Sequence, residues 1–136
     1  MNVVGIGTDI VDCDRIAKMI EKHDETFLAK VYTSWEIDYC GRHTGAAYQH
    51  YAGRWAAKEA ILKAIGTGWA RGIQWTDIEV QNIAGGAPIV QLHNRAREIC
   101  DEKGIDQILI SISHTKLYAT AFATAVGPTQ SVEPDN

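Results

Sequence analysis

Two carboxylates and a lysine are candidates for metal-assisted chemistry on a phosphate group. Asp9 stands near the start of the chain, and Glu59 and Lys63 lie four residues apart near its middle. Transfer from a pyrophosphate needs a hard cation held by few carboxylates, so that coordination positions stay open for phosphate oxygens and water. A lysine one helical turn from a carboxylate can stabilise the charge on the leaving phosphate. These three residues are the candidate catalytic residues, with Asp9 and Glu59 as the metal ligands.

Each of these residues also has an ordinary structural interpretation. An aspartate at the end of a strand commonly caps a helix or supports a turn, which is the favoured interpretation of Asp9 taken alone. Glu59 and Lys63 could form an ion pair on a helix that is buried on both sides. The functional alternative is a helix that offers one carboxylate and three cations, from Arg54, Lys58 and Lys63, to a metal or a polyanion. The spacing alone leaves both interpretations open.

The segment 54–68 is predicted to be the central helix of the fold. It is rich in helix-forming residues and ends in Gly66-Thr67-Gly68, which stops a helix. Its apolar residues recur at spacings of three and four and predict a core-facing side that consists of Ala57, Ala60, Ile61, Ala64 and Ile65. Trp55 and Leu62 lie among the charges of the other side, so we expect something apolar to cover that side too.

Three further segments are predicted to be strands. The first, residues 3–11, contains Gly5 and Gly7, which let another backbone or a ligand approach closely. The segments 108–114 and 118–126 both alternate in the way that strands do, and a tight hairpin joins them. The many alanines of the last segment predict a strand that packs closely under helices.

A helix is predicted from about residue 14 to residue 22, with Asp12 or Asp14 as its cap. Its cations recur at spacings of three and four beside a methionine that we expect to be exposed: Arg15, Lys18, Met19 and Lys22. Such a stripe is usually a solvated face. On an acidic protein it is also what a docking surface for an acidic helical partner requires.

The rest of the chain is predicted to form short elements. Thr33 and Glu36 have the spacing of a capping box and start another helix. The segment 41–51 lacks periodicity and is predicted to be a loop, and its His43 and His50 have no carboxylate or cysteine at ligand spacing. The elements expected after the central helix are a hairpin of strands at 75–83 and 88–92 and a helix at 94–103.

The size and charge of the chain limit the classes of protein that it can be. Its 136 residues suit one domain, which we expect at 1–126, followed by a disordered tail at 127–136. The net charge of −4 argues against nucleic acid as a general partner. We find no membrane span or signal peptide and expect a cytoplasmic protein. The three cysteines fit reduced thiols better than a disulfide framework or a zinc site.

Three motifs in this order resemble the holo-[acyl-carrier-protein] synthases, the small trimeric branch of the phosphopantetheinyl transferases. The motifs are Gly5-Ile6-Gly7-Thr8-Asp9-Ile10-Val11, then Gly53-Arg54-Trp55-Ala56-Ala57-Lys58-Glu59-Ala60 with Lys63-Ala64-Ile65-Gly66-Thr67-Gly68, and finally Ser111-Ile112-Ser113-His114-Thr115. Each motif alone is weak, but their order and spacing together make the resemblance specific. It covers about residues 3 to 126.

The resemblance implies an α+β fold, with one compact domain whose central helix packs on an antiparallel sheet. It implies transfer of the phosphopantetheine group of coenzyme A, with Mg²⁺, onto a serine of an apo acyl carrier protein, releasing adenosine bisphosphate. The residues that it implies for coenzyme A binding are Arg54, Lys58, Lys63, Gly66, His114 and Thr115. His114 is expected to come from a neighbouring protomer of a homotrimer. The position of Trp55 and Leu62 on the charged side also favours sites shared between subunits.

Some features depart from the family pattern or leave alternatives open. The turn Gly86-Ala87-Pro88 stands where Gly-Lys-Pro is common in the family, which removes a cation that could touch the ligand or its carrier. A module that docks carrier proteins without chemistry is one alternative, but it would have no use for Asp9, Glu59 and Lys63. A coenzyme A-dependent acyltransferase is another, and it would need a base near a thioester and no metal. The base that activates the carrier serine could be Asp9, Glu59 or a water on the metal.

Overall fold

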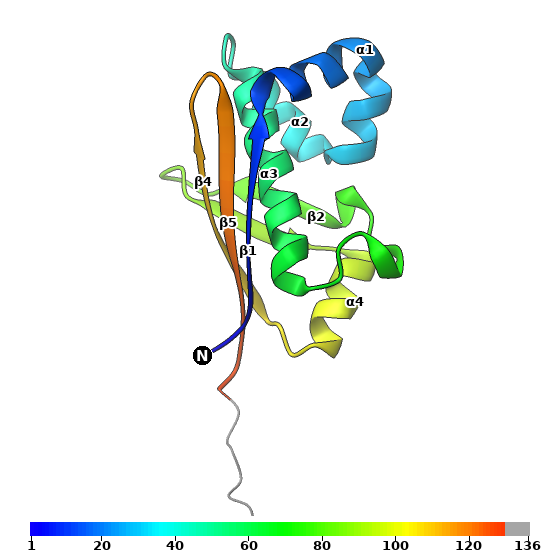
Figure 1. Ribbon diagram of the computed structural model, residues 1–136, viewed down its shortest axis with the longest axis vertical. Helices are drawn as coiled ribbons and strands as arrows, with labels where there is room; N and C mark the ends of the chain where they lie inside the picture. The colour runs from blue at the N-terminus through cyan, green and yellow to red at the C-terminus, as the bar shows by residue number, and fades with distance from the viewer. Residues whose placement is uncertain (130–136) are drawn as a thin grey trace, which may run out of the picture.

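A long helix lies against one side of a three-stranded antiparallel sheet in the computed structural model, which describes residues 1–129 (Figure 1). The elements in chain order are β1 Asn2–Asp12, α1 Cys13–Val31, α2 Ser34–Gly41, α3 Ala47–Ile65, β2 Ile78–Asn82, β3 Pro88–Leu92, α4 Asn94–Glu102, β4 Gln107–His114 and β5 Tyr118–Gly127. Short 3₁₀ turns occupy Ala70–Gly72 and Trp75–Asp77. The predicted α+β fold with a central helix on an antiparallel sheet is confirmed. Residues 130–136 of the predicted tail lie outside the described residues.

The sheet has the strand order β1-β5-β4, and a separate hairpin pairs β2 with β3. The alternation of β5 divides its residues between two faces. Its alanines face α3 and are buried, as the sequence predicted: Ala119, Ala121, Ala123 and Ala125. Phe122, on the opposite face, is exposed and pairs with Thr8 of β1. The small side chains on the inner face let the helix lie close to the sheet.

Two glycines of β1 bring its backbone directly against α3. A Cβ atom on Gly5 would lie 2.0 Å from the carbonyl oxygen of Ala64, and one on Gly7 would lie 2.0 Å from that of Ala60. Neither distance is possible for real atoms, so only glycine fits at these two positions. The predicted close approach at Gly5 and Gly7 is therefore confirmed, and the partner is the backbone of the central helix.

The central helix starts earlier and is buried more completely than the sequence predicted. It begins at Ala47 because residues that lack helical periodicity are held by tertiary contacts, such as the buried ring of Tyr51. Leu62 is only 1% exposed. Trp55 stacks on Phe27 of α1 and on Trp75, with ring centroids 5.9 Å and 4.3 Å apart. The apolar cover that we expected over the charged side thus comes from the same chain.

Helices α1 and α2 form a layer over the N-terminal half of α3 (Figure 1). Asp12 caps α1 through its Oδ1, which accepts from the backbone N–H of Asp14 at 2.9 Å. Helix α1 runs past the predicted end at residue 22, with an interruption at Asp24, where φ is 45°. The predicted capping box of α2 is confirmed, since Thr33 and Glu36 exchange both hydrogen bonds.

A buried ion pair ties these layers together. Lys58 Nζ of α3 donates to Glu36 Oε1 of α2 at 2.7 Å, and both side chains are fully buried. The same ammonium donates to the backbone oxygens of Val31 and Trp75, at 2.6 Å and 3.0 Å, while Glu36 Oε2 accepts from the N–H of Val80 at 3.0 Å. Burial lowers the pKa of Lys58 despite its carboxylate partner. A buried pair this well supplied with hydrogen bonds holds five segments in one arrangement, which are α1, α2, α3, the 3₁₀ turn at Trp75–Asp77 and β2.

The smaller elements differ from the prediction only at their ends. Strand β2 begins at Ile78 because the residues before it form a 3₁₀ turn. The N-cap of α4 is His93 rather than the predicted Asn94, whose φ is 49°. Within residues 1–129, no helix is long and apolar enough to cross a membrane.

We predict that Gly7→Ala costs about 3 kcal/mol or more of the free energy of unfolding, because the new methyl group would push β1 away from α3. Urea unfolding followed by circular dichroism measures this change. Gly41→Ala is the matched control, since a Cβ there meets no atom within 4 Å, and it should change stability by less than about 1 kcal/mol. Equal stability of the two variants would contradict the close contact.

Candidate active site

The predicted catalytic residues Asp9 and Lys63 meet where β1 runs against α3. Lys63 Nζ donates to Asp9 Oδ1 at 3.2 Å and to the backbone oxygen of Thr8 at 2.8 Å. Glu59 lies one turn before Lys63 on the same side of the helix. Its Oε1 accepts from Trp69 Nε1 at 3.4 Å. The close contacts at Gly5 and Gly7 bring the carboxylate of Asp9 beside the side of α3 that carries Lys63.

The surroundings of this cluster suit a hard cation. Asp9 keeps 20% of its side chain exposed and Lys63 keeps 54%, so a ligand can reach both. Mg²⁺ is commonly held by one or two carboxylates together with substrate phosphates, and the donor set of Asp9 and Glu59 fits that pattern. In residues 1–129 no group of three or more His, Cys, Asp or Glu side chains is arranged to hold a metal.

A second group of polar residues lines a cavity of about 210 Å³ near the N-terminal half of α3. Arg54 is only 3% exposed there, and its guanidinium lies 4.4 Å from the ring centre of Tyr39. One guanidinium nitrogen donates to Asn82 Oδ1. Its Nε is buried and has no partner among the described residues. A buried cation with an unused donor beside a cavity is suited to bind an anion.

Imidazole rings form another wall of the same cavity. His114, at the end of β4, and His50 of α3 both line it. His114 Nδ1 lies 2.9 Å from Gln49 Oε1. Burial, together with His43, His114 and Arg54 nearby, lowers the pKa of His50 to about 4. Sequence reasoning set His43 and His50 aside because it tested them only as metal ligands, and nothing in their spacing shows that they approach His114.

The two groups of residues lie on opposite sides of α3 within one chain. Arg54 and Lys63 are nine positions apart on the helix, which at about 100° per residue puts their side chains on opposite sides of it. The cavity therefore lies on the side of α3 toward β4, which contributes His114, and Asp9 lies on the other side, in β1. The structure brings Asp9 and Lys63 together, with Glu59 one helical turn before Lys63, and it puts Arg54 and His114 in one cavity, but it does not join the two groups.

Three other residues predicted to bind coenzyme A have structural roles. Lys58 uses all three of its ammonium hydrogens inside the core, so the prediction that it contacts a phosphate is not supported. Gly66 ends α3 in the left-handed conformation, with φ of 90°. The hydroxyl oxygen of Thr115 accepts from the N–H groups of Leu117 and Tyr118 in the β4–β5 turn.

The predicted docking stripe lies on α1, but its charges are partly engaged. Lys18 Nζ pairs with Asp14 at 2.8 Å, and this hydrogen bond raises the pKa of Lys18. The guanidinium of Arg15 lies 5.8 Å from the ring centre of Trp55. Met19 is half-buried against the core, so the expectation of an exposed methionine was wrong. Lys22 is exposed.

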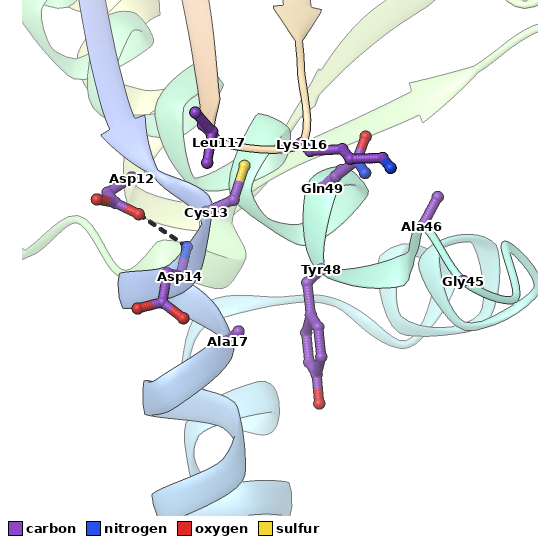
Figure 2. A pocket seen from close by; sticks show the side chains of 10 residues that line it. All are labelled: Asp12, Cys13, Asp14, Ala17, Gly45, Ala46, Tyr48, Gln49, Lys116 and Leu117. Atoms are coloured by element: carbon purple, nitrogen blue, oxygen red, sulfur yellow. Dashed lines mark hydrogen bonds between the residues drawn. The ribbon is translucent and has the colours of Figure 1, made fainter.

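A cavity of about 530 Å³ lies between the start of α1, the start of α3 and the β4–β5 turn. Figure 2 shows Asp12 and Cys13 on one side of it and Lys116 with Gln49 on another. Burial, and then the charge of Asp12, raises the pKa of Cys13, which keeps it a thiol. None of the predicted catalytic residues lines this cavity, so its size does not mark the catalytic centre.

Comparison with known proteins identifies the family. The sequence model described as the 4′-phosphopantetheinyl transferase superfamily matches residues 5–123. The holo-[acyl-carrier-protein] synthase of Desulforudis audaxviator is 43% identical over 129 residues, which cover 95% of this chain and 97% of that protein. That of Rhodopirellula baltica is 41% identical over 122 residues, which cover 90% of this chain and 96% of that protein.

Solved structures agree with the sequence matches. The holo-[acyl-carrier-protein] synthase of Neisseria meningitidis superposes with a TM-score of 0.83 at 31% identity, over 91% of this chain and 98% of that chain. The Helicobacter pylori enzyme, solved in complex with coenzyme A, superposes with a TM-score of 0.78 at 30% identity, over 89% of this chain and 99% of that chain. The resemblance drawn from the three motifs is confirmed. The chain belongs to the 4′-phosphopantetheinyl transferase superfamily.

Proposed function

We propose that the protein transfers the phosphopantetheine group of coenzyme A to a serine of an apo acyl carrier protein and releases adenosine bisphosphate. The observation that carries this proposal is the meeting of Asp9 with Lys63, one helical turn from Glu59. Full-length relatives named holo-[acyl-carrier-protein] synthase support it. A relative bound to coenzyme A supports the donor.

Asp9 and Glu59 would hold the Mg²⁺ ion that such a transfer needs. When bound, the ion supplies positive charge against the pyrophosphate of the donor. The carrier serine oxygen attacks the phosphorus next to the pantetheine arm, and the bond from that phosphorus to the bridging oxygen of the nucleotide breaks. Lys63 stabilises the charge that develops on the leaving phosphate, and its exposed ammonium can reach it. The serine proton passes to a base at the Asp9–Glu59 pair.

Arg54 and His114 would bind a phosphate group of the nucleotide. Both line the cavity near the N-terminal half of α3, where Arg54 Nε has no partner among the described residues. That cavity lies on the side of α3 opposite Asp9 and Lys63 of the same chain, toward β4 rather than β1. One donor molecule can touch both groups of residues most simply when they come from two neighbouring protomers.

The outer face of the sheet supports a homotrimer. Ile6 is 61% exposed, Ile10 is 67% exposed and Phe122 is 46% exposed. The strand register puts all three on the face opposite α3, and Figure 1 shows the helix on the other side. An apolar sheet face of this kind is suited to pack against copies of itself around an axis. This face, rather than Trp55 and Leu62, is the basis of the proposed assembly.

The basic stripe of α1 would dock the acidic carrier protein. Because the enzyme has a net charge of −4, attraction must come from a local patch. The residues proposed for docking are the cations Arg15, Lys18 and Lys22, and the half-buried Met19 is not among them. A cytoplasmic location is part of the proposal, since Cys13, Cys40 and Cys100 are all free and buried, as in proteins of reducing compartments.

We predict that Asp9→Ala and Glu59→Ala each nearly abolish transfer while the protein stays folded, because each loses a metal ligand worth about 3 kcal/mol or more in the transition state. The assay incubates enzyme, Mg²⁺, coenzyme A and apo carrier protein, then measures the intact mass of the carrier. Wild-type enzyme should add one phosphopantetheine group, and chelation of the metal should stop the addition. Full activity in the metal-free assay, or no mass gain with wild type, would contradict the proposal.

We predict that reversing Arg15 and Lys18 together to glutamate raises the KM for carrier protein about 10-fold or more, with little change in the KM for coenzyme A. The activity of wild type should also fall more steeply with added salt than that of the variant. Arg97→Glu, on the exposed side of α4, is a charge-reversal control that should leave both constants unchanged. An unchanged carrier KM in the double variant would show that the stripe is a solvated face.

A further inference from the structure

Three imidazole rings gather beside the buried arginine of the proposed nucleotide site. The ring centres of His43 and His50 are 3.8 Å apart, and those of His50 and His114 are 5.2 Å apart. The three come from different segments, because His43 precedes α3, His50 lies in α3 and His114 ends β4. His43 Nδ1 lies 2.7 Å from the backbone oxygen of Tyr39, which orients its ring. The cluster is therefore built by tertiary structure and not by local sequence.

The cavity that His50 and His114 line, with His43 packed behind His50, offers positive charge with no carboxylate among the described residues of its wall. Its lining residues are Tyr39, His50, Arg54, Asn82, Gly86, Pro88, Ile112 and His114. The ionisable groups near His50 are Tyr39 from α2, His43 from the segment before α3, Arg54 from α3 itself and His114 from β4. The β2–β3 turn adds only Asn82, Gly86 and Pro88. An ionised His50 would thus stand among cations.

Arg54 gives an independent sign that an anion belongs in this cavity. It is nine-tenths buried or more, with 3% of its surface exposed, and its Nε has no hydrogen-bond partner among residues 1–129. A buried guanidinium donor without a partner lowers the stability of the protein unless a ligand accepts its hydrogen bond. A phosphate oxygen placed there would accept from Arg54 and lie beside the imidazoles.

We propose that His43, His50 and His114 form a proton-linked site for a phosphomonoester of the donor nucleotide, so that the protein takes up a proton when coenzyme A binds. This inference rests on the proposed function, because it concerns the same donor. It adds two residues, His43 and His50, and a coupling between donor affinity and pH. The phosphomonoester is the group of coenzyme A that carries two negative charges, and the transfer reaction does not alter it.

The direction of the coupling follows from the charges. In the free protein the pKa of His50 is lowered to about 4, so the ring is neutral at pH 7. A dianion in the cavity stabilises the protonated ring and raises that pKa again. Binding near neutral pH then takes up a proton, and by linkage the donor binds more weakly as the pH rises. Between pH 7 and pH 8 we expect the dissociation constant of coenzyme A to rise about 2- to 10-fold.

Isothermal titration calorimetry in buffers of different ionisation enthalpy counts the protons directly. At pH 7, where the phosphomonoester of the free donor is mostly a dianion, wild-type protein should take up about half a proton or more per coenzyme A bound. Dephospho-coenzyme A, which lacks the phosphomonoester, should bind with little uptake. This comparison needs no substitution, so it does not depend on the folding of a variant.

Two variants test whether the proton uptake comes from the histidine cluster. His50→Phe keeps a planar ring between His43 and His114 but removes the proton site, and it should lose most of the uptake and most of the pH dependence. His43→Phe should reduce both in part. His23→Gln, on the exposed side of α1, is the control and should behave as wild type.

The outcomes separate this inference from the proposed function. If wild type binds coenzyme A and transfers phosphopantetheine but takes up no proton, or if His50→Phe takes up as much as wild type, the inference is wrong and the function stands. Equal uptake with coenzyme A and dephospho-coenzyme A would also overturn it. If wild type neither binds coenzyme A nor modifies a carrier protein, the function and the inference fall together.

Discussion

The close contact between β1 and α3 is the constraint on which the candidate site depends. Gly5 and Gly7 let the backbone of β1 touch the carbonyl groups of α3, and any larger residue would force the two apart. This contact puts Asp9 within hydrogen-bond distance of Lys63, although the two residues are 54 positions apart in the chain. A separation of one more side-chain layer would leave the carboxylate and the ammonium unable to act on one phosphate.

The rotation of α3 about its axis is set from the other side by the buried pair of Glu36 and Lys58. Because Lys58 is held by α2 and by two backbone carbonyls, its neighbour Glu59 points about 100° away around the helix and is only half-buried. Adjacent residues of one motif therefore do different work. Lys58 fixes the helix in the core, and Glu59 faces the ligand side with Lys63.

Much of the fold could be predicted from the sequence, because alternation, glycines and caps report on local geometry. Those patterns found the strands, the capping box of α2 and the tight approach at Gly7. They could not show whether a charged residue finds a buried partner, which is why Lys58 was predicted to bind phosphate. Nor could they show that His50 meets His114, since that contact depends on how α3 packs against the end of β4. Local patterns predicted the elements, and tertiary partners decided the roles.

The central claim is that the Asp9 group of one protomer and the His114 cavity of its neighbour share one donor molecule. Subunit mixing tests it most directly. Asp9→Ala and His114→Glu chains, each inactive alone, are unfolded and refolded together, and the trimers are isolated and assayed for transfer. A shared site is active only when a His114→Glu chain supplies Asp9 and its neighbour, an Asp9→Ala chain, supplies His114. In random 1:1 trimers this holds for about a quarter of the sites, so the mixture should regain about a quarter of wild-type activity. A mixture as inactive as its parts, or full activity in an isolated monomer, would contradict the shared site.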